Sequence, residues 1–278
     1  MKRWIGVMVV ALGMSGVVWA GEVRLQPGVP IEFEVASAPP SLAVLFRNND
    51  DKAVRMTIKL PKNYDESRSY PVCLFLSGGD GGTGGELWQA EPFLGAQDYI
   101  LCNMPLFKQY VAGSDLDRQL SISPADGPYA LAGMRVMLDE IRRLVPNVDE
   151  ARSVIAGFSN GANAIALMLW AGDSDLLARF GHYIMIEGGF WLGSDSDSSS
   201  GARFRRADFS GVQGKRVLVV YGAQQQPADR VPWVRSAQQT VAALKSAGID
   251  ATGQSMPNVG HDFPAAEMDR ARAWLLGE

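Results

Sequence analysis

The sequence predicts an α/β domain with a mostly parallel central sheet, helices on both of its faces and an antiparallel start. Short, continuous apolar runs recur along the chain, as expected for strands that are buried on both faces of a parallel sheet. Segments with a helical spacing of apolar residues alternate with these runs. The first apolar segments instead alternate apolar and polar residues, which is typical of antiparallel strands with one solvated face.

The predicted elements follow this pattern in chain order. The antiparallel start comprises residues 31–36 and 42–60, which contain the alternating segments IEFEV and VRMTIKL. Buried strands are predicted at residues 72–76, 100–104, 154–156, 183–186 and 217–221, and residues 252–256 are also strand-like. Helices are predicted at residues 129–144, 161–170, 233–247 and 265–276. No Pro- or Gly-rich linker divides the chain into two cores, so we expect one domain over residues 21–278.

Residues 1–20 have the layout of a cleaved secretory signal peptide. Two basic residues open the segment, an uncharged apolar stretch follows, and VWA at 18–20 is a small-x-small cleavage pattern. The apolar stretch is shorter than the roughly 20 residues that a spanning helix needs, so an uncleaved membrane anchor is the less favoured alternative. We therefore expect a secreted or periplasmic protein without stable membrane insertion after cleavage.

Charge argues against a nucleic acid or an anionic membrane as partner. The chain has 26 basic and 30 acidic residues, a net charge of −4. Without residues 1–20, which hold two basic and no acidic residues, the balance is 24 to 30 and the net charge is −6. An acidic chain has no electrostatic footprint for a phosphate backbone.

Cys73 and Cys102 both fall in predicted buried strands. An exported protein could pair them. A bridge between neighbouring parallel strands has unfavourable geometry, so two buried thiols are favoured and a disulfide is the alternative. Neither cysteine has a close histidine or cysteine in sequence, so the zinc-site spacing is missing.

Ser159 lies in the pentapeptide GFSNG, between the predicted strand SVIAG and the predicted helix NGANAIALMLW. A nucleophile on a tight strand-to-helix turn needs small neighbours, because larger side chains would collide with the strand and the helix. Gly157, Gly161 and Ala162 supply them. The turn would present the hydroxyl at the carboxyl end of the sheet and place the N–H of Asn160 at a helix start, where it can stabilise an oxyanion. This context favours a catalytic serine over an ordinary turn.

The chain has two histidines, one of which is a candidate base. His182 directly precedes the apolar run YIMI, so it would lie at the amino end of a strand, away from Ser159, in a structural role. His261 follows the predicted strand 252–256, and a loop at the carboxyl end of a late strand reaches the same edge of the sheet as Ser159. The order serine, acid, histidine also fits, although a lone polar loop histidine is the alternative.

The acid has two candidates. Asp229 is the only carboxylate in the loop GAQQQPADRVPW, which follows the strand 217–221 at the usual place for this group. It could instead be an N-cap or first-turn acid of the following helix. Glu187 ends the run YIMIE and would also point to the catalytic edge. The sequence favours Asp229 and leaves Glu187 open.

Glycines and aromatic residues complete the predicted site. The run SGGDGG follows the strand 72–76, and its glycines would let backbone N–H groups approach a ligand closely. We assign the second oxyanion donor to Gly79, with Asp80 as the neighbouring alternative; a phosphate cradle is disfavoured because no Lys-Ser/Thr pair follows. Trp191 and Trp233 could line the substrate pocket, and aromatic packing under loops explains them equally well.

Four segments, LPKNYDESRSYPVCLFLSGG, IAGFSNGANA, YGAQQQPADRVPW and VGHDFP, resemble the α/β-hydrolase superfamily. The resemblance runs from about Met56 to the end. It is strongest to exported esterases grouped around feruloyl esterases, esterase-D-like proteins and polyhydroxybutyrate-depolymerase-like enzymes. It implies Ser159 as nucleophile, His261 as base and an acid at or near Asp229. This chain departs from the family in having Ser77-Gly78 where His-Gly is usual and Gln225 where the acid often lies.

The resemblance implies a serine hydrolase that cleaves carboxylic esters through an acyl-enzyme, without a metal or organic cofactor. The expected substrate is a small-molecule or polymer-linked ester, carbohydrate-linked or otherwise met outside the cell. A serine peptidase of the same fold is one alternative, although such relatives usually carry a propeller or cap domain for which this chain has no room. A catalytically silent binding protein on the same scaffold is the other.

Overall fold

The computed structural model of the chain describes residues 23–43, 53–79, 84–108, 122, 124–190, 208–224 and 233–278. Within these residues, eight strands form one sheet in the order β1-β2-β4-β3-β5-β6-β7-β8. The strands are β1 (Pro30–Glu34), β2 (Arg55–Lys59), β3 (Val72–Leu76), β4 (Ile100–Asn103), β5 (Val154–Phe158), β6 (His182–Ile186), β7 (Arg216–Gly222) and β8 (Asp250–Met256). The β1–β2 and β2–β4 pairs are antiparallel and every other pair is parallel, which confirms the predicted fold class.

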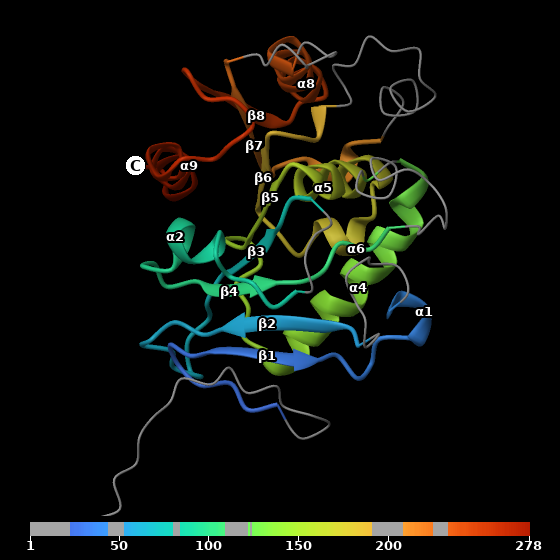
Figure 1. Cartoon of the computed structure of the whole chain (residues 1–278), viewed down its shortest axis with the longest axis vertical. Coiled ribbons are helices and arrows are strands. Elements are labelled where there is room, and N and C mark those ends of the chain that lie inside the picture. Colours follow the sequence, from blue (N-terminus) through green and yellow to red (C-terminus); the bar gives the residue numbers. More distant parts are fainter. Residues whose placement is uncertain are drawn as a thin grey trace, which may run out of the picture.

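Helices cover both faces of the sheet (Figure 1). They are α1 (Pro40–Ala43), α2 (Ala90–Leu94), α4 (Gly127–Leu144), α5 (Asn160–Ala171), α6 (Ser174–Leu177), α8 (Trp233–Ser246) and α9 (Ala265–Leu276), with 3-10 turns η1 (Pro124–Asp126) and η3 (Ser210–Val212). One buried cluster joins α4, α5 and α8 to strand residues such as Ile155 and Tyr183. A second buried cluster joins α2 and α9 to the strand residues that adjoin Ile155 and Tyr183 in sequence, including Val154 and Ile184. Successive strand residues point to opposite faces, so each strand supplies both cores.

The predicted strand over residues 42–60 is wrong in its extent. Residues 40–43 form the short helix α1, and the strand β2 spans only Arg55–Lys59. Pro40 opens the helix, where its fixed φ suits the first helical position and its missing N–H costs nothing. The buried residue Leu42 therefore lies on that helix and not on a strand. The other predicted strands and helices are present, with ends that differ by a few residues.

The two cysteines are free and buried, as favoured from the sequence. They lie on the adjacent parallel strands β3 and β4, where Cys73 pairs with Leu101 and Leu74 pairs with Cys102. Cys73 and Cys102 are therefore out of step by one residue and belong to the two different cores. Side chains on opposite faces of a sheet cannot meet in a disulfide.

The topology brings one set of loops together. Strands β3, β5, β6, β7 and β8 are mutually parallel, so all of them end at the same edge of the sheet. The loops that leave this carboxyl edge hold Gly79, Ser159, Glu187 and His261. In the part of the chain that is described, no helix combines the length and apolarity needed to cross a membrane. The predicted signal peptide lies outside the described residues.

Candidate active site

Ser159 occupies a tight turn between the end of β5 and the start of α5. Its backbone has φ 54° and ψ −113°, a conformation that residues other than glycine rarely adopt. Such a residue stores about 1–3 kcal/mol of strain and persists only where its surroundings hold it. Here the Ser159 N–H donates to the Ile186 carbonyl at 2.8 Å, and the Ser159 carbonyl accepts from the Asn163 N–H at 3.0 Å. Strand β6 and helix α5 thus clamp the turn from both sides.

The small residues around Ser159 are required by close backbone contacts. A Cβ atom on Gly157 would lie 2.8 Å from the Ala162 nitrogen and closer still to Gly161. A Cβ atom on Gly161 would collide with the carbonyl of Leu76 at the end of β3. This strand-to-helix turn, the Ser159 elbow, packs against both its own helix and the neighbouring strand, which is the steric reason expected from the sequence.

His261 lies beside the serine. Its Nε2 atom is 3.0 Å from Ser159 Oγ, and its side chain is 50% exposed. The loop that carries it turns at Asn258, which has φ 58°, and is tied to the end of β7 by a bond from the Gln224 N–H to the Val259 carbonyl at 3.0 Å. The ring of Phe158 supports the imidazole, with 4.9 Å between the ring centroids. His182 begins β6, at the opposite edge of the sheet.

Among the described residues, the carboxylate that lies against His261 is that of Glu187. Its Oε2 atom is 3.5 Å from His261 Nδ1, and its side chain is only 6% exposed. The other oxygen, Oε1, accepts a hydrogen bond from the Gly222 N–H at the end of β7. Glu187 was the alternative acid from the sequence, and the favoured candidate, Asp229, lies outside the described residues.

Gly222 is a site residue that the sequence analysis did not single out. Besides donating to Glu187, it leaves the space in which the Glu187 carboxylate and the loop of His261 meet. A Cβ atom there would lie 2.5 Å from the Gly260 carbonyl oxygen and 3.1 Å from Glu187 Oε1. A glycine directly at the end of the apolar run VLVVY, before the loop expected to hold the acid, was the available signal.

The predicted oxyanion residues lie next to the serine. A Cβ atom on Gly78 would be 3.2 Å from the Ser159 Cβ, so the loop after β3 reaches the elbow. Gly79 has φ 62°, and its carbonyl accepts a hydrogen bond from the Asn160 side-chain nitrogen at 2.5 Å. Asn160 is the first residue of α5, and the first N–H groups of a helix have no acceptor within the helix. Asp80, the neighbouring alternative, lies outside the described residues.

Of the two tryptophans predicted to line the substrate pocket, Trp233 lies within the described residues. Trp233 begins α8, and its ring packs edge-on against Phe190, with 5.6 Å between centroids and 76° between planes. Phe190 is itself buried. These are packing contacts, and a pocket-lining role for Trp233 stays a prediction. Trp191 lies outside the described residues.

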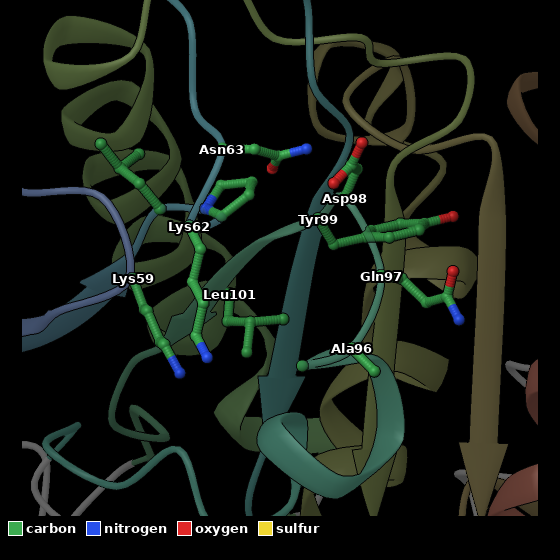
Figure 2. A pocket seen from close by; sticks show the side chains of 11 residues that line it. Lys59, Lys62, Asn63, Ala96, Gln97, Asp98, Tyr99 and Leu101 are labelled. Carbon is green, nitrogen blue, oxygen red and sulfur yellow. The ribbon is translucent and has the colours of Figure 1, made fainter.

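A separate hollow of about 270 Å³ lies away from this constellation (Figure 2). It is lined by residues at and after the end of β2 and by residues before and at the start of β4, and Figure 2 labels Lys59 and Lys62 among them. Leu101 near the start of β4 lines it, so it belongs to the amino edge of the sheet, opposite Ser159. Lys59 is ion-paired with Glu91. The described residues contain no group of three or more His, Cys, Asp or Glu side chains that could hold a metal ion.

The sequence matches no protein-family model and no curated protein. Solved structures do match. The propionate-bound esterase Est2 of Thermogutta terrifontis has a TM-score of 0.57 at 15% identity, over 84% of this chain and 92% of that chain. The chain has the α/β-hydrolase fold. The Bacillus cereus carboxylesterase shares it with a TM-score of 0.52 at 19% identity, over 79% of this chain and 92% of that one. A Rhizomucor miehei esterase does so with a TM-score of 0.53 at 14% identity, over 91% and 85%.

At these identities the likeness establishes the α/β-hydrolase fold alone, because this fold carries many different functions. The finer resemblance to feruloyl, esterase-D-like and polyhydroxybutyrate-depolymerase-like enzymes stays a prediction. What this chain does must follow from its own residues at the carboxyl edge.

Proposed function

We propose that the protein is a serine hydrolase of carboxylic esters, with Ser159 as nucleophile, His261 as general base and Glu187 as the acid. One observation carries the proposal. Ser159 Oγ, the two nitrogens of His261 and the buried Glu187 carboxylate form one continuous line, with 3.0 Å between serine and histidine and 3.5 Å between histidine and glutamate. A nucleophile joined to a base that a third group orients is the arrangement that activates a serine hydroxyl.

The charges and protons balance in the expected two-step reaction. Glu187 holds the Nδ1–H of His261, which leaves Nε2 free to take the proton of Ser159 as its oxygen attacks the ester carbonyl. Glu187 then stabilises the imidazolium, which returns the proton to the departing alcohol. Water repeats the sequence on the acyl-enzyme: His261 takes its proton, the acid product leaves and Ser159 is protonated again.

The oxyanion of the tetrahedral intermediate would be held by the N–H groups of Asn160 and Gly79. Both residues lie at the elbow, one at the start of α5 and the other in the loop after β3. Each such donor typically contributes about 10²- to 10³-fold to the rate. Backbone donors fixed by a helix and a tethered loop need little reorganisation during the reaction.

The assignment of the acid to Glu187 instead of Asp229 rests on three features of Glu187. It directly follows β6, it is buried, and the Gly222 N–H orients the carboxylate so that its second oxygen faces His261. A charge buried in this way needs partners, and a hydrogen bond on one oxygen with an imidazole on the other supplies them. Asp229 stays the alternative that a variant must test.

A small carboxylic ester is the proposed substrate. Support comes from structural neighbours described as esterases, one of which binds propionate and, in another structure, is phosphorylated by paraoxon. Carbohydrate-linked or polymer-linked esters outside the cell would fit the predicted signal peptide at residues 1–20 and a secreted or periplasmic location. Recovery of exported protein that begins at Gly21 would support that location, and intracellular protein that retains residues 1–20 would contradict it.

The function is tested with the purified protein, a fluorophosphonate probe and a substrate panel. We expect probe labelling and hydrolysis of p-nitrophenyl esters from acetyl to octanoyl, with no cleavage of a peptide anilide. Ser159→Ala should abolish labelling and lower turnover by at least about 10³-fold. Ser246→Ala, on the exposed end of α8, is the matched control and should leave both unchanged. Wild-type turnover by Ser159→Ala would overturn the proposal; peptide cleavage without ester cleavage would favour a peptidase, and no labelling at all a silent binding protein.

A further inference from the structure

Two asparagine side chains lie in the first turn of α5, directly behind the nucleophile. Asn160 is buried and Asn163 is half-buried, and the residues that follow them in the helix are buried and apolar. An amide in such a place is costly unless its donors and acceptors are paired. Their hydrogen bonds therefore show what these side chains hold in place.

Both amides bond to residues outside α5. Asn160 Nδ2 donates to the Gly79 carbonyl at 2.5 Å, and Asn160 Oδ1 accepts from the Ile122 N–H at 3.1 Å. The same Oδ1 accepts from Asn163 Nδ2 at 3.3 Å. Asn163 Oδ1 in turn accepts from the Gly189 N–H at 2.8 Å. The amides thus form a line of three hydrogen bonds from Gly79 through Asn160 and Asn163 to Gly189.

The two ends of this line belong to the two loops that the proposed mechanism needs to fix. Gly79 lies in the loop assigned to the oxyanion, and Gly189 lies two residues after Glu187. Both glycines have positive φ, 62° and 75°, so neither continues a regular strand. A Cβ atom on Gly79 would meet no described atom within 4 Å. Among the described residues, the hydrogen bond from Asn160 Nδ2 ties Gly79 to α5.

We infer that Asn160 and Asn163 are positioning residues that hold the oxyanion loop and the Glu187 turn at a fixed separation across the nucleophile. The inference rests on the proposed function, which assigns Gly79 and Glu187 their roles. An amide suits this task because it donates and accepts at once, whereas a carboxylate only accepts. The Asn160 side chain acts through Gly79, and the Asn163 side chain acts through the turn after Glu187.

This chemistry allows each tether to be cut separately. Asn160→Asp keeps the acceptor for Ile122 and Asn163 but replaces the donor to Gly79 by an oxygen that repels the carbonyl. Asn163→Asp keeps the acceptor for Gly189 but loses the donor to Asn160 Oδ1, whereas Asn163→Ala removes both. Asn147→Asp is the matched control, because its amide also donates to a backbone carbonyl, that of Glu66 at 2.7 Å, on an exposed loop away from the site.

We expect Asn160→Asp to lower kcat on a p-nitrophenyl ester by about 10²-fold with KM nearly unchanged, since a displaced oxyanion donor acts in the transition state. Asn163→Ala should shift the acidic limb of the pH profile, because the turn after Glu187 would lose its tether, whereas Asn163→Asp, which keeps the acceptor for Gly189, should shift it less. The double variant Asn160→Asp with Asn163→Ala should lose less than the product of the single losses, because one line connects the two tethers.

Circular dichroism and fluorophosphonate labelling separate the outcomes. Folded Asn160→Asp with wild-type kcat, or equal pH profiles for all Asn163 variants, would overturn the inference. If Asn147→Asp and Asn160→Asp lose equal amounts of kcat and of thermal stability, the inference is likewise wrong, because Asn160 and Asn163 then have only a structural role. If Asn160→Asp does not fold, a comparison of the pH profiles of Asn163→Ala and Asn163→Asp tests the inference instead. A wild-type protein that takes no probe and cleaves no ester would instead defeat the proposed function itself.

Discussion

Replacing Glu187 by glutamine is the most direct test of how the site works. The glutamine side chain would have the same shape as the native one but no charge. Because the Gly222 N–H requires an acceptor, the amide oxygen would occupy the Oε1 position and the NH₂ group would face His261. That NH₂ group favours the imidazole tautomer in which Nδ1 is unprotonated. In this tautomer Nε2 carries the proton, so it cannot accept the proton of Ser159.

The size of the effect follows from the geometry. At the 3.5 Å between Glu187 and His261, Coulomb's law with an effective dielectric of about 20 gives about 5 kcal/mol for the carboxylate–imidazolium pair, or roughly three and a half decades of rate. Half of the His261 side chain is exposed, so solvent screens part of this attraction. The wrong tautomer adds to the loss. We therefore expect kcat to fall by about 10³-fold.

Steady-state hydrolysis of p-nitrophenyl acetate from pH 5 to pH 9 measures this loss, with thermal melting to establish that the variant is folded. Asp229→Asn is the paired variant, and we expect its kcat to stay within about twofold of the wild type. If Glu187→Gln keeps kcat within threefold while Asp229→Asn loses two decades or more, the acid is Asp229 and the assignment made from the structure is wrong.

Three further predictions concern strain, protonation and thiols. Ser159→Gly should melt about 2–4 °C above Ser159→Ala, since glycine relieves roughly 1 kcal/mol of the strain at φ 54°; equal melting temperatures would mean an unstrained elbow. Burial and the nearby Arg216 lower the pKa of His182 from its usual 6.5, so the unfolded chain binds the proton first and stability is lost as the pH falls below about 6.5. His182→Gln should flatten that loss in urea unfolding between pH 7.5 and pH 5, and an unchanged slope would contradict the assignment. Burial raises the pKa of both Cys73 and Cys102, which are free thiols. Without reductant, an aromatic disulfide reagent should therefore label two thiols only after unfolding. Rapid labelling of the native protein, or no labelling after unfolding, would contradict buried free thiols.

The secondary structure was largely predictable because its signals are local. Continuous apolar runs marked the parallel strands, and GFSNG marked the turn between one of them and a helix. The failure at residues 42–60 was also local in origin. Pro40 lies just before this segment, and its fixed φ suits the start of the helix α1, which covers residues 42 and 43. That proline was the available signal that the segment begins in a helix.

The acid shows where local signals stop. Glu187 and Asp229 both follow strands that end at the carboxyl edge, so strand order alone could not choose between them. What places Glu187 is its backbone at φ 52° and the Gly222 N–H, which lies 35 residues away in the sequence. Side-chain direction after a strand depends on such details, which no periodicity reports.

By itself, the sequence determined the α/β architecture, the strand-to-helix turn at Ser159 and the edge of the sheet at which His261 would meet it. These follow from periodicity, from the size of glycine and from the rule that parallel strands end at one edge. Only the tertiary structure showed that the Glu187 carboxylate lies 3.5 Å from His261 and that Asn160 bonds to Gly79, 81 residues away in the sequence. Those contacts depend on how separate loops approach one another to within a hydrogen bond, and that separation is set by the packing of the whole sheet and its helices.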